Sequence, residues 1–265
     1  MFAEIDGQHS VLFRNRLEAL IRTHGEAANV HVFVHQMRSE LQKGPTCGFA
    51  ALLMALRCSQ CQLAEEVTLQ HLVEMGKSLG FTYQGELFSA AWMCELVDRL
   101  WPKKYQLKLT QFPTANAIIQ HLISGESASE RRCPTTVLVP YDCDKNFEPC
   151  NRQGNAAHWA LIIGFVLLEQ SVQNGEEIHS VGPRVAEFNA HNFFGRNFDN
   201  EHLLYLVALQ GKSRHPALWS YSALRESNGQ LNVPTPKGNF RLAPEGLAAI
   251  KGKCVLFCGS KVEEG

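Results

Sequence analysis

The sequence lacks an excess of charge of either sign, since 25 lysines and arginines stand against 26 aspartates and glutamates, for a net charge of −1. General nucleic-acid binders and membrane-surface proteins carry a strong basic excess, so this balance argues against both classes. No apolar run reaches the length of a membrane span, and residues 1–6 lack the basic and then apolar layout of a signal peptide. We therefore expect no nucleic-acid partner and no membrane partner.

Proline runs and internal repeats are also missing, because the 11 prolines are scattered along the chain. The cysteines number nine, so they cannot all pair. Without a secretion signal, cysteines in this number point to reduced thiols and a cytoplasmic location. The 265 residues can bury a substantial core. We expect one domain over residues 1–265, with a helical N-terminal region over residues 1–28 and a polar, flexible insertion over residues 169–200.

The most informative stretch of the chain is residues 42–56. Every residue from 49 to 56 is apolar, which predicts a helix buried on nearly all sides. Pro45 suits the approach to a helix, and Thr46 is a residue type that caps the first free backbone N–H groups. Cys47 then falls in the first turn, where the unpaired N–H groups concentrate partial positive charge and favour a thiolate.

This pattern favours a nucleophilic cysteine over the alternative, a structural thiol that behaves as a small buried hydrophobe. Gly48 leaves the approach to the sulfur unobstructed. The side-chain amide of Gln42, a few residues upstream, is placed to donate to an oxyanion that develops beside the sulfur. We therefore predict Cys47 as the nucleophile and Gln42 as the oxyanion donor.

A cysteine nucleophile needs a base, normally a histidine far away in the sequence. His158 begins an apolar strand after a polar loop, so it can point across a cleft at a helix N-terminus, and Trp159 can shield the pair from water. The alternative is a histidine that only ends a strand. Six other histidines have the character of surface or strand-face residues, namely His31, His35, His71, His121, His202 and His215.

A third group is expected to orient the imidazole by accepting from its second nitrogen. Gln210, at the end of the predicted strand over residues 203–209, is one candidate. Asn189 and Asn192 are the other two, and the sequence does not decide among the three.

The apolar periodicity predicts an α+β fold in which a helical first half packs on a mostly antiparallel sheet from the second half. Helices are predicted over residues 12–22, 49–56, 67–79, 86–101, 114–124 and 222–226. Strands are predicted over residues 30–35, 105–109, 135–139, 160–168, 203–209 and 254–258. The long apolar strand over residues 160–168 belongs in the middle of a sheet that is covered on both faces.

Several segments together carry a resemblance to a known family. They are residues 42–56, His158 with Trp159, and residues 206–213, 218–221 and 224–228. In these segments the chain resembles the actin maturation proteases, cytosolic cysteine peptidases that are distantly similar to papain-like and bacteriocin-leader peptidases. The resemblance covers most of the chain from about residue 42 onward.

The resemblance implies a papain-like fold and an aminopeptidase that removes the acetylated first residue, Met or Cys, from immature actin through an acyl-enzyme, without a cofactor. It implies Cys47 as nucleophile, His158 as base and Gln42 as oxyanion donor. The sequence departs from the pattern in two ways. Gln42 lies one position nearer the cysteine than in papain-type enzymes. No proline-rich tail of the kind suited to profilin is present, so profilin-bound actin is the weaker partner prediction.

An actin N-terminus is acidic, so the enzyme would need a positively charged rim around its cavity. Lys43, Lys212 and Arg214 are candidates for this rim.

Three alternative interpretations of the chain stay open. A zinc site is suggested by the spacing of Cys58 and Cys61, with partners among Cys143, Cys150, Cys254 and Cys258. The chain could also be a non-catalytic actin-binding module of the same fold, or another cysteine enzyme that transfers acyl groups or cleaves isopeptide bonds.

Overall fold

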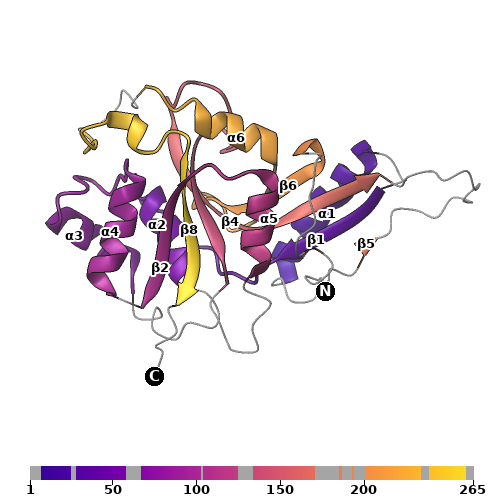
Figure 1. Cartoon of the computed structure of the whole chain (residues 1–265), viewed down its shortest axis with the longest axis horizontal. Coiled ribbons are helices and arrows are strands. Elements are labelled where there is room, and N and C mark those ends of the chain that lie inside the picture. Colours follow the sequence, from indigo (N-terminus) through magenta and orange to yellow (C-terminus); the bar gives the residue numbers. More distant parts are fainter. Residues whose placement is uncertain are drawn as a thin grey trace, which may run out of the picture.

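The structure is a computed structural model, and it describes residues 7–24, 28–57, 67–102, 104–124, 134–170, 185–186, 193, 201–233 and 239–260. A mostly antiparallel sheet runs through the molecule, with helices on both of its faces (Figure 1). Its strands are β1 (Ala28–Val34), β2 (Tyr105–Gln111), β3 (Thr136–Asp142), β4 (Ala157–Gln170), β5 (Val185–Ala186), β6 (Leu204–Leu209), β7 (Ala217–Ser220) and β8 (Lys253–Ser260).

The central strand is β4, which pairs antiparallel with β3, β1 and β6. β3 and β1 pair with successive halves of one edge of β4, and β6 pairs with the other edge. β8 and β2 extend the sheet beyond β3, and β7 extends it beyond β6. The pairing of β1 with β5 is parallel. The prediction of a mostly antiparallel sheet is therefore confirmed.

Alternating side chains of β4 enter two separate cores. Leu161 and Ile163 belong to the core on one face, and Ala160 and Ile162 belong to the core on the other. Because both faces are covered, the strand is almost continuously apolar, as the sequence predicted. The helices are α1 (Gly7–His24), α2 (Cys47–Leu56), α3 (Leu69–Ser78), α4 (Ala90–Leu100), α5 (Ala115–Ile123) and α6 (Tyr221–Gly229). Short 3-10 turns cover Glu201–Leu203 and Gly246–Ala249.

The first face is packed by residues of α1, α2, α3 and α4, and the second by residues of α5 and α6. The α+β class is therefore confirmed, and most helices of the described chain come from the first half and most strands from the second, with exceptions that the sequence also predicted. β1 and β2 come from the first half, and α6 comes from the second. The similarity to papain and the single domain over residues 1–265 stay predictions.

One predicted helix begins later than expected. The sequence predicted a helix over residues 86–101, whereas α4 begins at Ala90 and is capped by the hydroxyl of Ser89, which accepts from Trp92 N at 3.2 Å. The side chain of Glu86 instead accepts the N–H groups of Tyr83 and Gln84, each at 2.8 Å, and so closes a turn before the helix. This turn contributes to the functional site described below.

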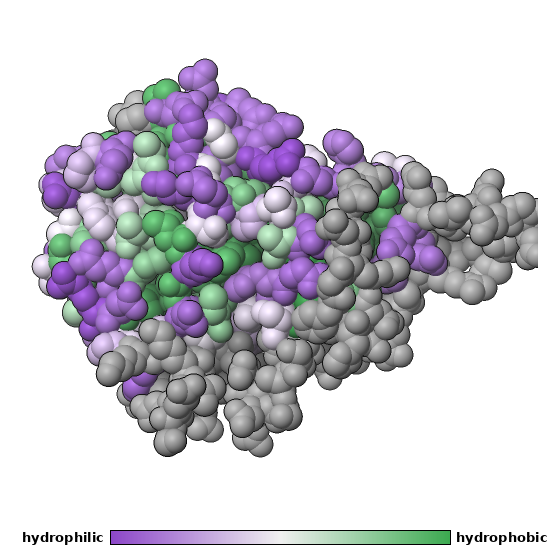
Figure 2. All heavy atoms as spheres, in the orientation of Figure 1, coloured by the Kyte–Doolittle hydropathy of each residue, from purple (hydrophilic) through white to green (hydrophobic). Residues whose placement is uncertain are grey.

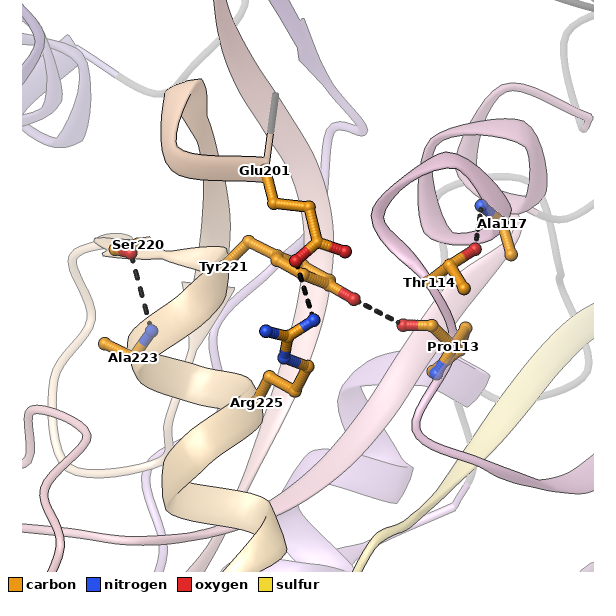
Figure 3. Close-up of polar contacts among 8 residues, drawn as sticks. All are labelled: Pro113, Thr114, Ala117, Glu201, Ser220, Tyr221, Ala223 and Arg225. Carbon is orange, nitrogen blue, oxygen red and sulfur yellow. Dashed lines mark hydrogen bonds and ion pairs between the residues drawn. The ribbon is translucent and has the colours of Figure 1, made fainter. Parts of the chain in front are cut away.

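The second face is tied together where α6 meets the start of α5 (Figure 3). The hydroxyl of Tyr221 donates to the carbonyl of Pro113 at 2.9 Å, and Arg225 donates to Glu201 at 2.6 Å while lying over the Tyr221 ring. The hydroxyls of Ser220 and Thr114 cap α6 and α5. These contacts hold α6 in place, and α6 in turn contacts the end of β3.

The predicted insertion over residues 169–200 begins too early, because residues 169 and 170 belong to β4. Apart from β5 and residue 193, the remainder lies outside the described residues. None of the helices in the described part of the chain combines the length and the apolar character needed to cross a membrane.

Candidate active site

Cys47 is the first residue of α2, and every other residue of that helix is buried. The first helical hydrogen bond runs from Ala50 N to the carbonyl of Thr46 at 2.9 Å. The predicted side-chain cap was wrong, because the hydroxyl of Thr46 bonds to Lys43 O and Lys43 N instead. The first N–H groups of α2 are therefore not occupied by Thr46, and the N–H of Gly48 contacts the sulfur of Cys47.

His158, the second residue of β4, is the side chain that meets this sulfur. It pairs with Tyr141 across the sheet and is buried. Its Nε2 lies 3.0 Å from the carbonyl oxygen of Gln210, which leaves the other ring nitrogen to bond to the thiol of Cys47. The rings of Tyr141 and Phe147 flank the imidazole, with centroids 5.7 and 5.8 Å away. The structure therefore brings Cys47 and His158 together.

Electrostatics at this pair favour charge separation. Burial would raise the pKa of the Cys47 thiol, but the charge and hydrogen bond of His158 and the N–H groups of Trp159 and Gly48 outweigh it, so the pKa lies below its ordinary value. Burial would lower the pKa of His158, but the Cys47 thiolate raises it above its ordinary value. The two shifts have one cause, an attraction between thiolate and imidazolium.

Of the candidates for the third group, Gln210 lies against His158. Its main-chain carbonyl, and not its side chain, contacts His158. The side-chain oxygen accepts from Lys212 N at 2.9 Å and so closes a turn just after β6. This turn brings the Gln210 carbonyl to the imidazole. Asn189 and Asn192, the other two candidates, lie outside the described residues.

Gln42 lies beside the same site. Its main-chain N–H donates to Gly211 O at 2.8 Å, and its side-chain Nε2 donates to Gly44 O at 2.7 Å. Gly211 has a φ of +61°, and an added Cβ there would lie 3.3 Å from Gln42 Oε1. The carboxamide is thus held between two glycine turns, and Nε2 keeps one hydrogen that the bond to Gly44 does not use.

A cavity of about 180 Å³ opens beside the sulfur. For comparison, an apolar cavity of about 150 Å³ accommodates benzene. The lining of the cavity beside Cys47 is mostly apolar. It consists of Gln42, Pro45, Cys47, Glu86, Leu87, Phe88, Cys143, Ala156, Ala157, His158, Trp159, Phe240 and Ile250. The indole N–H of Trp159 donates to Leu87 O at 2.7 Å, so Trp159 forms a fixed part of this wall. The cavity can therefore hold a single apolar side chain next to the nucleophile.

Two buried carboxylates support the walls of the cavity, and sequence reasoning missed both. Asp142, at the end of β3, accepts from the N–H groups of Arg152, Gly154 and Ala156 at 2.7 to 3.0 Å, and so fixes the loop that leads into His158. Gln230, just after α6, donates to the same carboxylate at 3.1 Å. The Glu86 carboxylate holds the opposite wall, as described below. Because most of these donors are backbone N–H groups, no residue-type pattern marks them in the sequence.

The other predicted site residues do not gather around a metal. Cys143, Cys150, Cys254 and Cys258 are free thiols, while Cys58 and Cys61 lie outside the described residues. No cluster of three or more potential metal ligands occurs within the described ranges.

The basic residues predicted to form a positive rim, Lys43, Lys212 and Arg214, are exposed. Lys212 lies 5.7 Å from the centre of the Phe147 ring that flanks His158. None of these three lines the cavity, so their role as a positive rim stays a prediction.

Comparison with known proteins shows the family of the chain. Residues 37–166 match a family model for the C-terminal domain of actin maturation protease-like proteins. The chain is 37% identical to the actin maturation protease of Xenopus tropicalis over 227 residues, which cover 83% of this chain and 70% of that relative. It is 35% identical to the enzyme of Mus musculus over 241 residues, covering 85% and 63%. It is 32% identical to that of Homo sapiens over 242 residues, covering 85% and 65%.

The chain thus spans about two thirds of the length of the curated relatives that it matches. The matched segment of the family model includes both Cys47 and His158. On these similarities, the chain belongs to the actin maturation protease family.

Proposed function

We propose that this chain is a cysteine peptidase that removes the acetylated first residue, methionine or cysteine, from immature actin. The observation that carries the proposal is the contact between Cys47 and His158 at the mouth of an apolar cavity, with the pKa of the thiol held below its ordinary value. A thiolate at neutral pH is the form that attacks a carbonyl carbon. The relatives are named for actin maturation, which supplies the substrate class.

In the first half of the reaction, the Cys47 sulfur attacks the carbonyl carbon of the first residue. The resulting oxyanion would accept from the free hydrogen of Gln42 Nε2 and from the N–H groups at the start of α2. The imidazolium of His158 then gives its proton to the departing amine, and the shortened protein leaves. The acylated residue stays on the sulfur as a thioester.

In the second half, neutral His158 removes a proton from water, and the oxygen attacks the thioester. The acetylated amino acid is released and the thiol is restored. The carbonyl of Gln210 accepts from His158 Nε2 throughout, so it keeps the imidazole oriented toward the sulfur. A main-chain carbonyl carries no full charge, so most of the stabilisation of the imidazolium would come from the thiolate itself.

The lining of the cavity supports a capped substrate. Among the described residues that line it, the one carboxylate is Glu86, whose oxygens already accept three backbone N–H groups. A free terminal ammonium would have to compete with those N–H groups for the carboxylate. An acetylated end has no charge to satisfy, and it leaves apolar atoms to face Leu87 and Phe88.

The test is incubation of the protein with actin N-terminal peptides, acetylated or free, followed by mass analysis. We expect the wild type to release one acetylated residue and the Cys47→Ala variant to release none. Cys94→Ala is the matched control, because Cys94 is a free, half-buried thiol on α4 whose pKa is raised by burial to about 12. Cleavage by Cys47→Ala, or by wild type only on free termini, would contradict the proposal.

A further inference from the structure

We propose that Phe240 sets the upper size limit for the side chain of the substrate's first residue, and that Glu86 is a positioning residue that holds Phe240 in the cavity wall. This inference rests on the proposed function and assigns one part of its specificity to two residues. Both line the cavity beside Cys47, although they lie 154 positions apart in the chain.

The segment that carries Phe240 is fastened to the loop before α4. The ring of Phe240 packs on that of Phe88, with centroids 5.7 Å apart, and Leu242 forms a β-bridge with Phe88. On the other side of Phe240, the carbonyl of Asn239 accepts from the side chain of Gln84 at 3.2 Å. Phe240 is therefore held on both flanks by one short loop.

Glu86 supplies the central contact of this arrangement. Glu86 is 2% exposed, and its carboxylate accepts from Arg241 N at 2.7 Å, as well as from the N–H groups of Tyr83 and Gln84. Burial would raise the pKa of Glu86, but these backbone N–H groups outweigh it and keep the carboxyl ionised. The guanidinium of Arg241 turns away, toward Gly80 O and the Tyr83 hydroxyl. Glu86 therefore fixes the backbone next to Phe240 and makes no ion pair with Arg241.

Among the large apolar wall residues, Phe240 is the one that can set size without supporting the core. Leu87, Phe88 and Ile250 are 2%, 7% and 1% exposed and belong to the main core cluster or pack within it, whereas Phe240 is half-buried at its edge. Truncation of Phe240 would therefore enlarge the cavity and leave the core packed. A larger first residue would then fit where the ring had been.

The experiment is a competition between two acetylated peptides that differ only in the first residue, methionine in one and phenylalanine in the other. Because both peptides compete for the same enzyme in one tube, the ratio of their kcat/KM values does not depend on how much of the enzyme is folded. We expect Phe240→Ala to raise the phenylalanine-to-methionine ratio by at least about tenfold, since even one extra or missing methylene group in an apolar pocket is worth about 10- to 200-fold. Phe112→Ala, which removes a half-buried ring that contacts Tyr221, should leave the ratio unchanged.

A second variant tests the positioning role. Glu86→Gln should raise the ratio in the same direction, because one carboxylate oxygen becomes an NH2 group that faces a backbone N–H and disturbs the three-way contact. In the Phe240→Ala background the same change should add nothing to the ratio if Glu86 acts through Phe240. An equal effect of Glu86→Gln in both backgrounds would overturn its positioning role.

An unchanged ratio in Phe240→Ala, with acetyl-methionine still cleaved by wild type, would overturn the inference alone. If the wild type cleaves no acetylated peptide, the proposed function fails, and the inference fails with it.

Discussion

At the scale of single residues, the reactivity of Cys47 depends on two opposing effects. Burial of the sulfur penalises the thiolate, while His158 and two backbone N–H groups stabilise it. The pKa of Cys47 lies below its ordinary value because the imidazole of His158 is within hydrogen-bonding contact of the sulfur and attracts the thiolate. If His158 is removed, only the N–H groups remain against the penalty of burial.

We therefore predict how the alkylation rate of Cys47 depends on pH. In the wild type the rate should reach half of its maximum below the ordinary thiol pKa of about 8.5. In His158→Ala the midpoint should move upward by at least about one pH unit, because the main stabilising charge is gone. The rate is read from the mass of the modified peptide that contains Cys47. Equal midpoints in the two proteins would contradict the proposed ion pair.

The positions of Cys47 and His158 could be predicted from the sequence because each depends on a local signal, while their catalytic roles stay a proposal. An apolar helix indicates the position of Cys47 at its start, and a polar loop before an apolar strand indicates that of His158. The contact from Gln210 could not be predicted in its actual form. Which atom of Gln210 reaches His158 depends on the turn just after β6, where the side-chain oxygen accepts from Lys212 N and the main-chain carbonyl contacts the imidazole. The residue type alone does not predict this choice.

At the scale of elements, α2 and β4 form the rigid unit that carries the site. α2 packs against β4, and Gly48 of α2 lies against the Trp159 side chain of β4. A Cβ at Gly48 would lie 3.0 Å from Leu87 Cβ and 3.1 Å from Trp159 Cδ1. Glycine is therefore needed at this position for packing, since its φ is not in the left-handed region.

We predict that Gly48→Ala lowers the free energy of unfolding by about 1–3 kcal/mol through overpacking. The variant should also slow alkylation of Cys47, because the added methyl group displaces Trp159, whose backbone N–H contacts the sulfur. Gly229→Ala is the matched control in α6, where an added Cβ meets nothing within 4 Å. That variant should be neutral or more stable by up to about 1 kcal/mol. Urea unfolding measures the stability of both variants, and equal stabilities of Gly48→Ala and Gly229→Ala would contradict the packing account.

Most elements could be predicted from apolar periodicity, and the exceptions have specific causes. The start of α4 was placed four residues early because residues 86–88 are compatible with a helix by type, whereas Glu86 is used to bind backbone N–H groups of its own turn. β7 was missed because four residues give too short an alternation to recognise, and its existence depends on pairing with β6. Local side-chain-to-backbone hydrogen bonds decide the first case, and a long-range strand partner decides the second.

At the scale of the whole molecule, polar side chains lie in the interior as well as on the surface. In the space-filling view, hydrophobic residues gather at the middle of the visible face and hydrophilic ones surround them (Figure 2). Two histidines, at the end of β1 and on α5, were predicted to be surface or strand-face residues. His35 proves to be buried and bonds to Leu122 O, and His121 bonds to Thr136 O. Burial lowers the pKa of both, to about 4 for His35.

This burial predicts a loss of stability in weak acid. The unfolded chain binds a proton at His35 near pH 6.5, whereas the folded protein does so only near pH 4. Protonation of His35 therefore costs no stability above pH 6.5. As the pH drops toward 4 the free energy of unfolding falls, and the loss levels off at roughly 3 kcal/mol below pH 4.

The measurement is urea unfolding at pH 7 and pH 5. His35→Phe should lose less stability between these values than the wild type, because it has no proton to bind there. His71→Phe, an exposed position on α3, should behave as the wild type does. The same loss in His35→Phe as in the wild type would show that His35 is not the group responsible.

The central claim is that Cys47 carries the acylated first residue of the substrate as a thioester. The most direct measurement is acid quenching of the wild type during turnover of an acetylated actin N-terminal peptide, followed by mass mapping of the protein. The account predicts an acetyl-aminoacyl group on the peptide that contains Cys47, and its absence from the Cys47→Ala variant. Product formation with the adduct on another residue, or an adduct that persists in Cys47→Ala, would contradict it.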